Sequence, residues 1–291
     1  MTIRTALADA ARRLAEAGVA DAAREAGWLL AHAAGTSVGT LRAWGDRELS
    51  PGVLSEFDRL VARRAAREPI QYILGTQEFC GLTFRVTPDV LIPRLDTEVL
   101  VERAVAHLKA QSASTEGGAL TVADIGTGSG AIAVAVAHLL PAARVVAVDI
   151  SPAALAVARG NASINGVAER IDFRLGDLLE PLGADHFDAI LSNPPYIPTA
   201  EWQSLMPEVR EWEPKEALTP GDDGLLFYRR LAREAPARLK AGGFLAVEVG
   251  IRQAPAVAAL FAAVGLSTVV YQDTGGVERV VLGQRRERTL A

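Results

Sequence analysis

The amino-acid sequence predicts a doubly wound α/β sheet preceded by a small helical bundle. From residue 120 onward, apolar strand-like runs alternate with helix-like segments, which is typical of a mostly parallel sheet with helices on both faces. Before residue 67, apolar residues instead recur at helical spacing between glycines. We therefore expect a helical domain over residues 1–67, a β-hairpin linker over 68–95 and the sheet domain over 96–291.

The first domain is predicted to consist of helices separated by glycine. Leu7, Ala11 and Leu14 lie at i, i+4 and i+7, ahead of a stop at Gly18. Ser50-Pro51 combines an N-cap serine with a proline at the first helical position, so another helix should begin there. No catalytic group stands out in this region. Binding or orienting a substrate is the function that we expect of it.

The linker is marked by a change in the spacing of apolar residues, from a helical period to short β-rich runs. Residues 69–92 contain β-rich runs broken by Gly75 and Gly81, and we expect a hairpin there. A helix over 96–110 should follow. After it, the polar and glycine-rich residues 111–118 predict a surface loop.

Seven strand candidates make up the predicted sheet. In chain order they are LTVADI, RVVAVDI, IDFRL, FDAILS, GGFLAVEVG, LSTVVYQ and VERVVLG. Helical patterns separate the first strands, and further helices are expected at 223–239 and 251–264. The last two strands are close enough in sequence for an antiparallel hairpin. The prediction is therefore a seven-stranded, Rossmann-like sheet with a C-terminal hairpin.

Composition limits the cellular setting and the class of site. The 291 residues are 49% hydrophobic, and Cys80 is the single cysteine, which excludes an intramolecular disulfide and a cysteine-based zinc site. The N-terminus lacks the apolar segment of a signal peptide, and no apolar run approaches the roughly 18 residues of a membrane span. We expect a soluble, cytoplasmic protein with no membrane contact and no metal.

The charge distribution disfavours a duplex-binding surface. Net charge is −5, and the residues after 75 carry 20 Lys and Arg against 26 Asp and Glu. Binding to a DNA duplex usually requires a basic face, so no direct DNA binding is expected. One local basic cluster contains Arg59, Arg63, Arg64 and Arg67. It is either a solvated helix face or a contact for an acidic or RNA partner.

A glycine-rich turn follows the first strand of the sheet, with the sequence Gly126-Thr127-Gly128-Ser129-Gly130. Glycines there let a ligand approach the backbone at a helix N-terminus. Asp149 ends the second strand, where a carboxylate meets ribose hydroxyls in nucleotide-binding sheets, and Asp177-Leu178 follows the third strand, where an adenine would lie.

The spacing of this turn narrows the choice of cofactor. It departs from GxGxxG, and the sequence has no GxxxxGK[ST], which disfavours NAD and ATP. An acidic and compact site suits a cation, and the sulfonium of S-adenosylmethionine is one. The alternative is that Asp149 and Asp177 only cap helices.

A second motif, Asn193-Pro194-Pro195-Tyr196, ends the fourth strand. The prolines stop the strand and stiffen the chain. The Asn193 carboxamide oxygen and the Pro194 carbonyl can accept the two N–H groups of a planar amide, and Tyr196 can cover that amide or the sulfonium. Ligands of open α/β sheets bind at this end of the strands. We expect Asn193, Pro194 and Tyr196 to act in catalysis, all four residues to bind substrate, and Asn193 also to bind the cofactor; the alternative is a rigid turn alone.

Together the motifs resemble one family, the release-factor glutamine methyltransferases (PrmC/HemK). The resemblance extends from about residue 67 to 283, and EPIQYILG (68–75) and IPRLDTE (92–98) are its most specific stretches. It implies a class I S-adenosylmethionine-dependent methyltransferase fold, with S-adenosylhomocysteine as a product. It further implies methylation of N5 of the glutamine in the GGQ motif of peptide chain release factors. Leu95 departs from the family's usual proline, so a slightly less rigid segment is expected there.

Other substrates remain open at the level of sequence. N5-methylation of a glutamine in a ribosomal protein would need the same chemistry. Adenine-N6 methylation of DNA or RNA would also use an NPPY motif, but it requires a base-flipping pocket and a basic channel. A binding module that has lost catalysis, or a scaffold on ribosomal RNA, is a further alternative.

Overall fold

The computed structural model describes residues 1–114 and 119–286. The chain forms two compact units. One unit comprises Met1–Thr76 together with Met206–Trp212, and the other comprises Gln77–Leu205 together with Glu213–Ala291. The chain therefore leaves the first unit, returns to it for seven residues, and leaves again.

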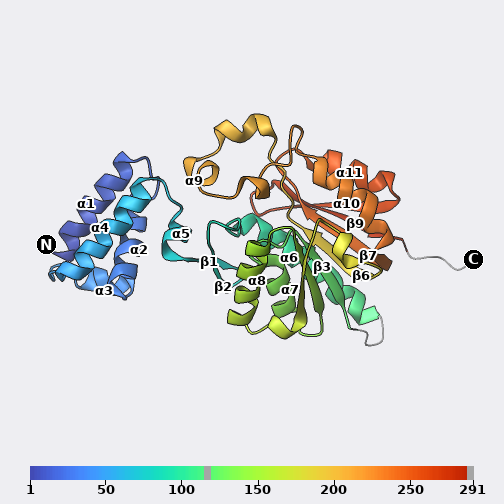
Figure 1. The fold of residues 1–291 in the computed structure, drawn as a ribbon, viewed down its shortest axis with the longest axis horizontal. Helices are drawn as coiled ribbons and strands as arrows, with labels where there is room; N and C mark the ends of the chain where they lie inside the picture. The colour runs from blue at the N-terminus through green and yellow to red at the C-terminus, as the bar shows by residue number, and fades with distance from the viewer. Residues whose placement is uncertain (115–118, 287–291) are drawn as a thin grey trace, which may run out of the picture. The chain divides into compact units, whose positions relative to one another are not determined.

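The first unit is a helical bundle, as expected. Its helices are α1 (Ile3–Glu16), α2 (Ala22–Ala34), α3 (Val38–Ala43), α4 (Pro51–Ala65), α5 (Ile70–Leu74) and α9 (Pro207–Arg210). The helices α1, α2 and α4 pack on one another around Leu14, Leu30 and Phe57 (Figure 1). The start of α4 is confirmed, because Ser50 accepts a hydrogen bond from the Val53 amide and Pro51 follows it.

The structure corrects the expected start of the linker. Residues 70–74 form α5 and not a β run, because Ile70 and Ile73 turn into the core of the helical bundle. A short apolar run does not distinguish helix from strand by its period alone. The two-stranded hairpin begins after Gly75, with β1 (Thr76–Phe79) and β2 (Leu82–Arg85).

The basic cluster of α4 is neutralised within the helical unit. All four guanidiniums pair with carboxylates, in the pairs Arg59–Glu56, Arg63–Glu68, Arg64–Glu25, Arg64–Glu208 and Arg67–Glu208. Arg59 lies on a solvated face, as one of the two expectations had it. Arg64 does not, because only 5% of the residue is exposed. Its burial reflects the return of the chain at Met206–Trp212, which brings Glu208 to it.

The second unit contains the predicted seven-stranded sheet. Its strands are β3 (Thr121–Ile125), β4 (Arg144–Asp149), β5 (Ile171–Leu175), β6 (Phe187–Ser192), β7 (Leu239–Glu248), β8 (Leu266–Gln272) and β9 (Glu278–Arg285). The order is β5-β4-β3-β6-β7-β9-β8. β9 runs antiparallel to β7 and β8, which confirms the C-terminal hairpin, and the other pairs are parallel.

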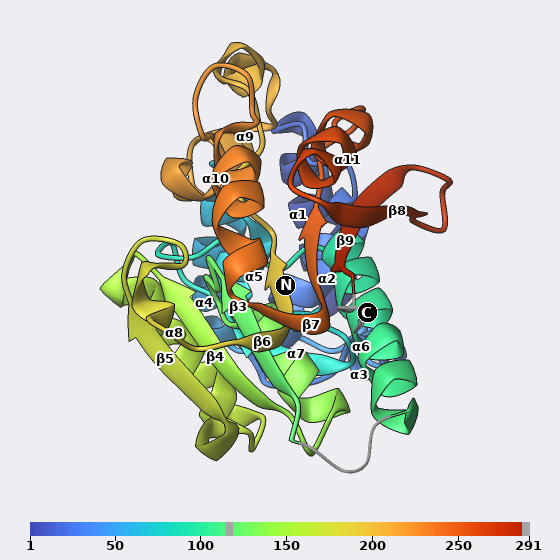
Figure 2. The same cartoon turned by 90° about the vertical axis from the view of Figure 1, so that its right-hand side faces the viewer.

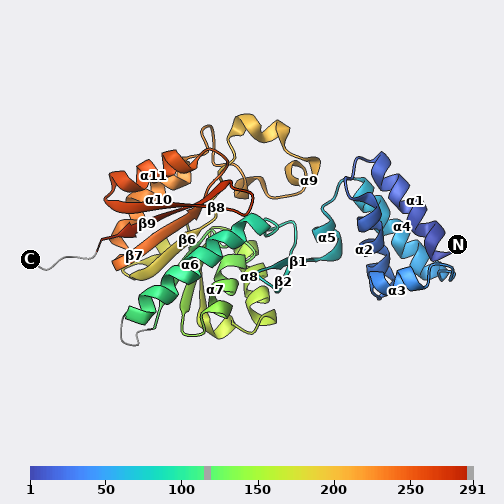
Figure 3. The same ribbon diagram turned by 180° about the vertical axis from the view of Figure 1, so that it is seen from behind.

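Helices cover both faces of this sheet. They are α6 (Leu95–Ser114), α7 (Ala131–Leu139), α8 (Pro152–Ile164), α10 (Leu226–Glu234) and α11 (Ala254–Ala263). The first three pack on one face, and α10 and α11 pack on the other (Figure 2). Figure 3 shows α6 alongside α7. The central α7 is buried from Ala131 to Ala137, which explains why its sequence is apolar on all sides.

Three helix boundaries differ from the expectations. α6 continues to Ser114 and not to residue 110, since QSAS contains no glycine or proline to stop it; the rest of the expected loop, 115–118, lies outside the described residues. α10 ends at Glu234, and a 3-10 turn at Ala235–Ala237 follows, because Pro236 cannot continue the α-helical hydrogen bonds. α11 begins only at Ala254, beside Pro255.

The topology positions the site. Strand order reverses between β3 and β6, and ligands of open α/β sheets bind at the carboxyl ends of the strands at such a switch point. The glycine-rich turn follows β3, Asp149 ends β4, Asp177 follows β5 and Asn193 follows β6. The fold therefore brings four separated sequence features to one edge of the sheet.

Candidate functional site

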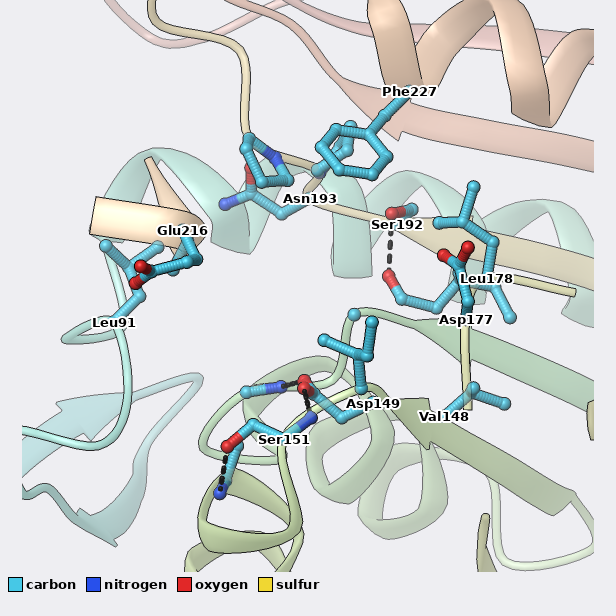
Figure 4. Close-up of a pocket in the computed structure, with 18 of the residues that line it drawn as sticks. Leu91, Val148, Asp149, Ser151, Asp177, Leu178, Ser192, Asn193, Glu216 and Phe227 are labelled. Atoms are coloured by element: carbon cyan, nitrogen blue, oxygen red, sulfur yellow. Dashed lines mark hydrogen bonds between the residues drawn. The ribbon is translucent and has the colours of Figure 1, made fainter. Parts of the chain in front are cut away.

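A cavity of about 600 Å³ opens at this edge of the sheet, a size that suits a small-molecule cofactor. The turn after β3, the ends of β4 and β6, and residues 89–91 and 214–217 form its walls. Figure 4 shows Asp149 and Ser151 on one side of the cavity, and Asn193 with Phe227 on the other.

The glycine turn presents backbone to the cavity at two positions. Gly126 and Gly128 line the cavity with φ values of 72° and 53°, and a Cβ added to either would meet nothing within 4 Å. A side chain there would project into space that a ligand can use. At Gly130 glycine is required for a different reason. A Cβ added there would lie 3.0 Å from the Ala158 Cβ and would push α7 away from α8.

Thr127 and Ser129 face away from the cavity and hold the turn. The Thr127 hydroxyl donates to Asp124 Oδ2 over 2.6 Å, and the Ser129 carbonyl accepts from Asn161 Nδ2 over 2.8 Å. Burial raises the pKa of Asp124 to about 7, against the opposing effect of the Thr127 hydrogen bond. Neither Thr127 nor Ser129, nor Gly130, is among the described residues that line the cavity.

Asp149 lies at the cavity wall with its carboxylate oriented by backbone amides. Oδ2 accepts from the Gly128 amide over 2.8 Å, and Oδ1 accepts from the Ser151 amide over 2.9 Å (Figure 4). A carboxylate has about four lone-pair directions, so each oxygen can still accept a hydroxyl. Burial raises the pKa of Asp149, and the amide bonds oppose the shift.

Asp177 and Leu178 lie beside it. The Asp177 carboxylate is paired on both oxygens by Arg230, at 3.1 and 2.8 Å. This pair raises the pKa of Arg230. Leu178 holds a left-handed backbone with φ of 48° and lines the cavity, with Phe227 of α10 also in the wall. Arg230 and Phe227 were not predicted, since a helix that follows β6 by more than 30 residues gives no local sign of facing this edge.

At the end of β6 the structure places Asn193, Pro194 and Pro195 in the cavity wall. Asn193 Nδ2 donates to Thr97 Oγ1 over 3.0 Å, so its Oδ1 remains able to accept a further donor. Tyr196 is placed differently. It is not among the described lining residues, and its hydroxyl donates to Glu248 Oε1 over 3.2 Å.

Glu248 is a buried acid next to the NPPY motif that was not predicted from the sequence. It ends β7 with 1% of its surface exposed, and it accepts from Thr97 Oγ1 over 2.5 Å as well as from Tyr196. Burial raises its pKa to about 7, although both hydrogen bonds oppose the shift. The available signal was a lone acid in the otherwise apolar run GGFLAVEVG.

The stretch at residues 92–98 supports this wall of the cavity. Arg94 Nη2 pairs with Glu213, whose other oxygen accepts from the Ile92 amide over 3.2 Å, which joins 90–94 to 213–217. Glu98 accepts from the Cys80 amide over 2.6 Å. Leu95 begins α6 and is 66% exposed, so the position where the family pattern has proline is an unpacked first helical residue.

Residues 1–114 and 119–286 contain neither a cluster of metal ligands nor a membrane-spanning helix. No group of three or more His, Cys, Asp or Glu there is placed to hold a metal ion. No helix in that part of the chain is long and apolar enough to span a bilayer. Burial raises the pKa of the Cys80 thiol to about 12.

Comparison with known families gives two matches. Residues 5–75 match the PrmC N-terminal domain, and residues 97–208 match the methyltransferase small domain. The second match contains the glycine turn, Asp149, Asp177 and Asn193.

Comparison with individual proteins extends over nearly the whole chain. A release factor glutamine methyltransferase of Geobacter sulfurreducens is 50% identical over 97% of this chain and 96% of its own length. One of Moorella thermoacetica is 47% identical over 99% of this chain and 100% of its own. In the fold alone, a methyltransferase from Pyrococcus furiosus superposes with a TM-score of 0.50 at 19% identity, over 71% of this chain and 90% of that structure.

Proposed function

The chain belongs to the family of release factor glutamine methyltransferases, and on that premise we propose that it methylates N5 of the glutamine in the GGQ motif of peptide chain release factors. The methyl donor is S-adenosylmethionine. One observation above all supports this: Asn193 already donates its Nδ2 to Thr97, so that its carboxamide oxygen is the atom available to a substrate N–H at the cavity wall.

The residues present fit the cofactor. Gly126 and Gly128 leave the backbone open to the cavity, and the carboxylates of Asp149 and Asp177 can accept from a ribose and an adenine amine. Leu178 supplies an apolar contact in the same wall. Thr127, Ser129 and Gly130 act on the shape of the turn. When bound, S-adenosylmethionine supplies a methyl group on a positively charged sulfur and becomes S-adenosylhomocysteine.

The substrate amide is positioned by the NPPY motif. Asn193 Oδ1 accepts one N–H of the glutamine side chain, and the Pro194 carbonyl accepts the other. An amide nitrogen is a weak nucleophile because its lone pair is conjugated, so fixing both hydrogens directs the out-of-plane density of the nitrogen toward the methyl carbon. Pro194 and Pro195 hold this geometry with little ordering on binding.

Proton loss needs no strong base. As the new N–C bond forms and the C–S bond breaks, the nitrogen becomes very acidic and releases one of its two protons to water. Tyr196 lies outside the cavity wall and contributes through its hydroxyl bond to Glu248. The net change is replacement of one N–H by N–CH₃.

The helical unit is proposed to contact the release factor. It contains the match to the PrmC N-terminal domain, and the catalytic residues proposed here all belong to the other unit. Since its four clustered arginines pair with its own carboxylates, RNA binding through them is not favoured. A substrate of the translation machinery also places the activity in the cytoplasm.

Incubation with labelled S-adenosylmethionine tests the proposal. A release factor, a ribosomal protein mixture and DNA are offered in parallel, and mass spectrometry locates any methyl group. We expect one methyl group on the GGQ glutamine and none on DNA. A methyl group on a ribosomal protein glutamine alone would keep the chemistry and change the substrate, and methylated adenine would contradict the proposal.

A further inference from the structure

Three hydrogen bonds, one buried and two partly buried, connect the cavity wall to one carboxylate. Asn193 Nδ2 donates to Thr97 Oγ1, Thr97 Oγ1 donates to Glu248 Oε2, and the Tyr196 hydroxyl donates to Glu248 Oε1. These bonds join four residues from three segments: Thr97 of α6, Glu248 of β7, and Asn193 and Tyr196 of the NPPY motif. Both ends of the 193–196 segment are therefore fixed, directly or through Thr97, by Glu248.

The chemistry of the carboxylate determines which atom donates and which accepts in each of these hydrogen bonds. An ionised carboxylate accepts hydrogen bonds and cannot donate, and a threonine hydroxyl has one proton. Thr97 must therefore donate its proton to Glu248, and only the lone pairs of its hydroxyl oxygen remain to accept from Asn193. Asn193 can meet those lone pairs with Nδ2 but not with Oδ1. Its oxygen is thereby left for the cavity.

We propose that Glu248 is a positioning residue that selects, through Thr97, which atom of the Asn193 carboxamide faces the substrate. The inference rests on the function proposed above, because it is the oxygen that the substrate amide needs. Glu248 itself touches no reacting atom. Its contribution is to exclude the flipped carboxamide, which would present two N–H donors to an amide that also offers N–H groups.

The remaining contacts of the segment fix its backbone. Gln253 Nε2 donates to the Tyr196 carbonyl over 2.9 Å, and Gln253 Oε1 accepts from the Gly250 amide over 2.9 Å. A Cβ at Gly224 would lie 2.4 Å from the same Tyr196 carbonyl. The backbone of the motif is thus held independently of Glu248, so a change at Glu248 acts mainly on the side-chain orientation of Asn193.

Protonation of Glu248 would reverse the direction of the hydrogen bonds between Glu248, Thr97 and Asn193. A protonated Oε2 donates to Thr97, whose proton must then go to Asn193 Oδ1. The groups that face Glu248 act in both directions: Arg279 favours the ionised form, Asp96 disfavours it, and Thr97 and Tyr196 donate to it. Because burial outweighs these bonds and raises the pKa to about 7, turnover should rise with pH through that region.

Three variants separate these roles. Glu248→Gln places an N–H₂ group against either Thr97 or Tyr196, so it either flips Asn193 or leaves a buried donor unpaired. Thr97→Val removes the relay at nearly constant volume, and Thr97→Ser restores it. Glu169→Gln, at an exposed position after α8, is the matched control for loss of a carboxylate.

Steady-state kinetics with a release factor, at saturating S-adenosylmethionine, gives the main readout. We expect kcat of Glu248→Gln and Thr97→Val to fall by about 10- to 100-fold, while the Kd of S-adenosylmethionine stays within about twofold of wild type. Thr97→Ser should recover most of kcat. Between about pH 6 and 8 the wild-type kcat should rise, and Glu248→Gln should lose that rise.

Two results would overturn the inference: wild-type kcat in both Glu248→Gln and Thr97→Val, or a Glu248→Gln enzyme that keeps the wild-type pH profile at lower kcat. Failure of the proposed function looks different, since then the wild-type chain itself leaves the release factor unmethylated. In that case, NMR of the Asn193 side-chain amide still tests whether Glu248 orients Asn193. Its N–H₂ signals should change with pH near 7 in wild type and not in Glu248→Gln; signals that are independent of pH in wild type reject the inference.

Discussion

At the scale of single residues, the acidic side chains of the cavity differ in how they are held. Asp149 accepts hydrogen bonds from two backbone amides, and Asp177 accepts two from the guanidinium of Arg230 in α10. Amide donors are part of the turn itself and orient Asp149 before any ligand binds. Preorganised acceptors of this kind lose little entropy on binding.

Asp149→Ala should weaken the binding of S-adenosylmethionine. Loss of a charge-assisted acceptor costs about 1.5–3 kcal/mol, which corresponds to a Kd roughly 10- to 100-fold higher. Titration calorimetry measures the change. Asp172→Ala, an exposed position on β5, serves as the control. An unchanged Kd would remove Asp149 from the cofactor site.

Asn193→Ala should give the opposite result, with binding of the cofactor nearly intact and turnover lost. Removing one oriented acceptor at the reacting group typically lowers kcat by about 10²–10³-fold. Single-turnover methylation of a release factor, together with calorimetry of S-adenosylmethionine, separates the two quantities. Methylation at a near wild-type rate would show that Asn193 does not hold the substrate amide.

At the scale of elements, the strand–turn–helix unit of β3 and α7 uses its glycines for two purposes. Gly128 opens the turn to the cavity, and Gly130 lets α7 approach Ala158 of α8. Both have positive φ, so an alanine at either position costs about 1 kcal/mol in the backbone. What differs is the space that the new methyl group enters.

Alanine at these two glycines should therefore have distinct effects. Gly130→Ala should lower the free energy of unfolding by about 2–4 kcal/mol, because backbone strain adds to a 3.0 Å contact with Ala158. Gly128→Ala should lower it by only about 1 kcal/mol but raise the Kd of S-adenosylmethionine. Urea unfolding and calorimetry compare the pair. Equal losses of stability in both variants would contradict the assignment.

At the scale of the molecule, the return of the chain at Met206–Trp212 ties distant residues into the helical unit. Glu208 pairs with Arg64 and Arg67, from which it is separated by 144 and 141 residues. Arg64 is buried and has Glu25 as a second partner, with the Glu68 carbonyl as a third. Burying these charges is tolerable only because the charged groups remain paired.

Glu208→Gln should lower the free energy of unfolding by about 1–3 kcal/mol, less than for a fully unpaired buried charge because Glu25 remains. The loss should depend on pH. Burial raises the pKa of Glu208, but the bonds from Arg67 and Arg64 outweigh it and lower the pKa below 4.5 in the folded chain. The stabilisation is therefore complete above pH 4.5 and is lost as the pH falls through the lower folded pKa.

Thermal and urea unfolding across this pH range check the prediction. Glu56→Gln is the control, since the Glu56–Arg59 pair is exposed and solvent screens it, so its loss should change stability little. If Glu208→Gln were as mild as Glu56→Gln, the buried pairs would not stabilise the unit.

Much of the fold could be predicted from the sequence, because each element carries a local pattern. The seven strands, the glycine turn after β3 and the N-cap of α4 follow from apolar period, glycine spacing and capping residues. The edge where Asp149 and Asn193 meet also follows, since consecutive parallel strands end on the same side. The family resemblance added the glutamine substrate, which no spacing determines.

Only the tertiary structure decided which side chains meet across those elements. Thr97 and Glu248 are 151 residues apart, and their bond decides the orientation of Asn193. Arg230 reaches Asp177 from another helix, and Arg64 is buried by a segment that returns from far along the chain. The period of apolar residues and the spacing of motifs reflect only interactions between residues close together in the sequence. Hydrogen bonds between distant segments depend on how the packed elements align, which leaves no local trace in the sequence.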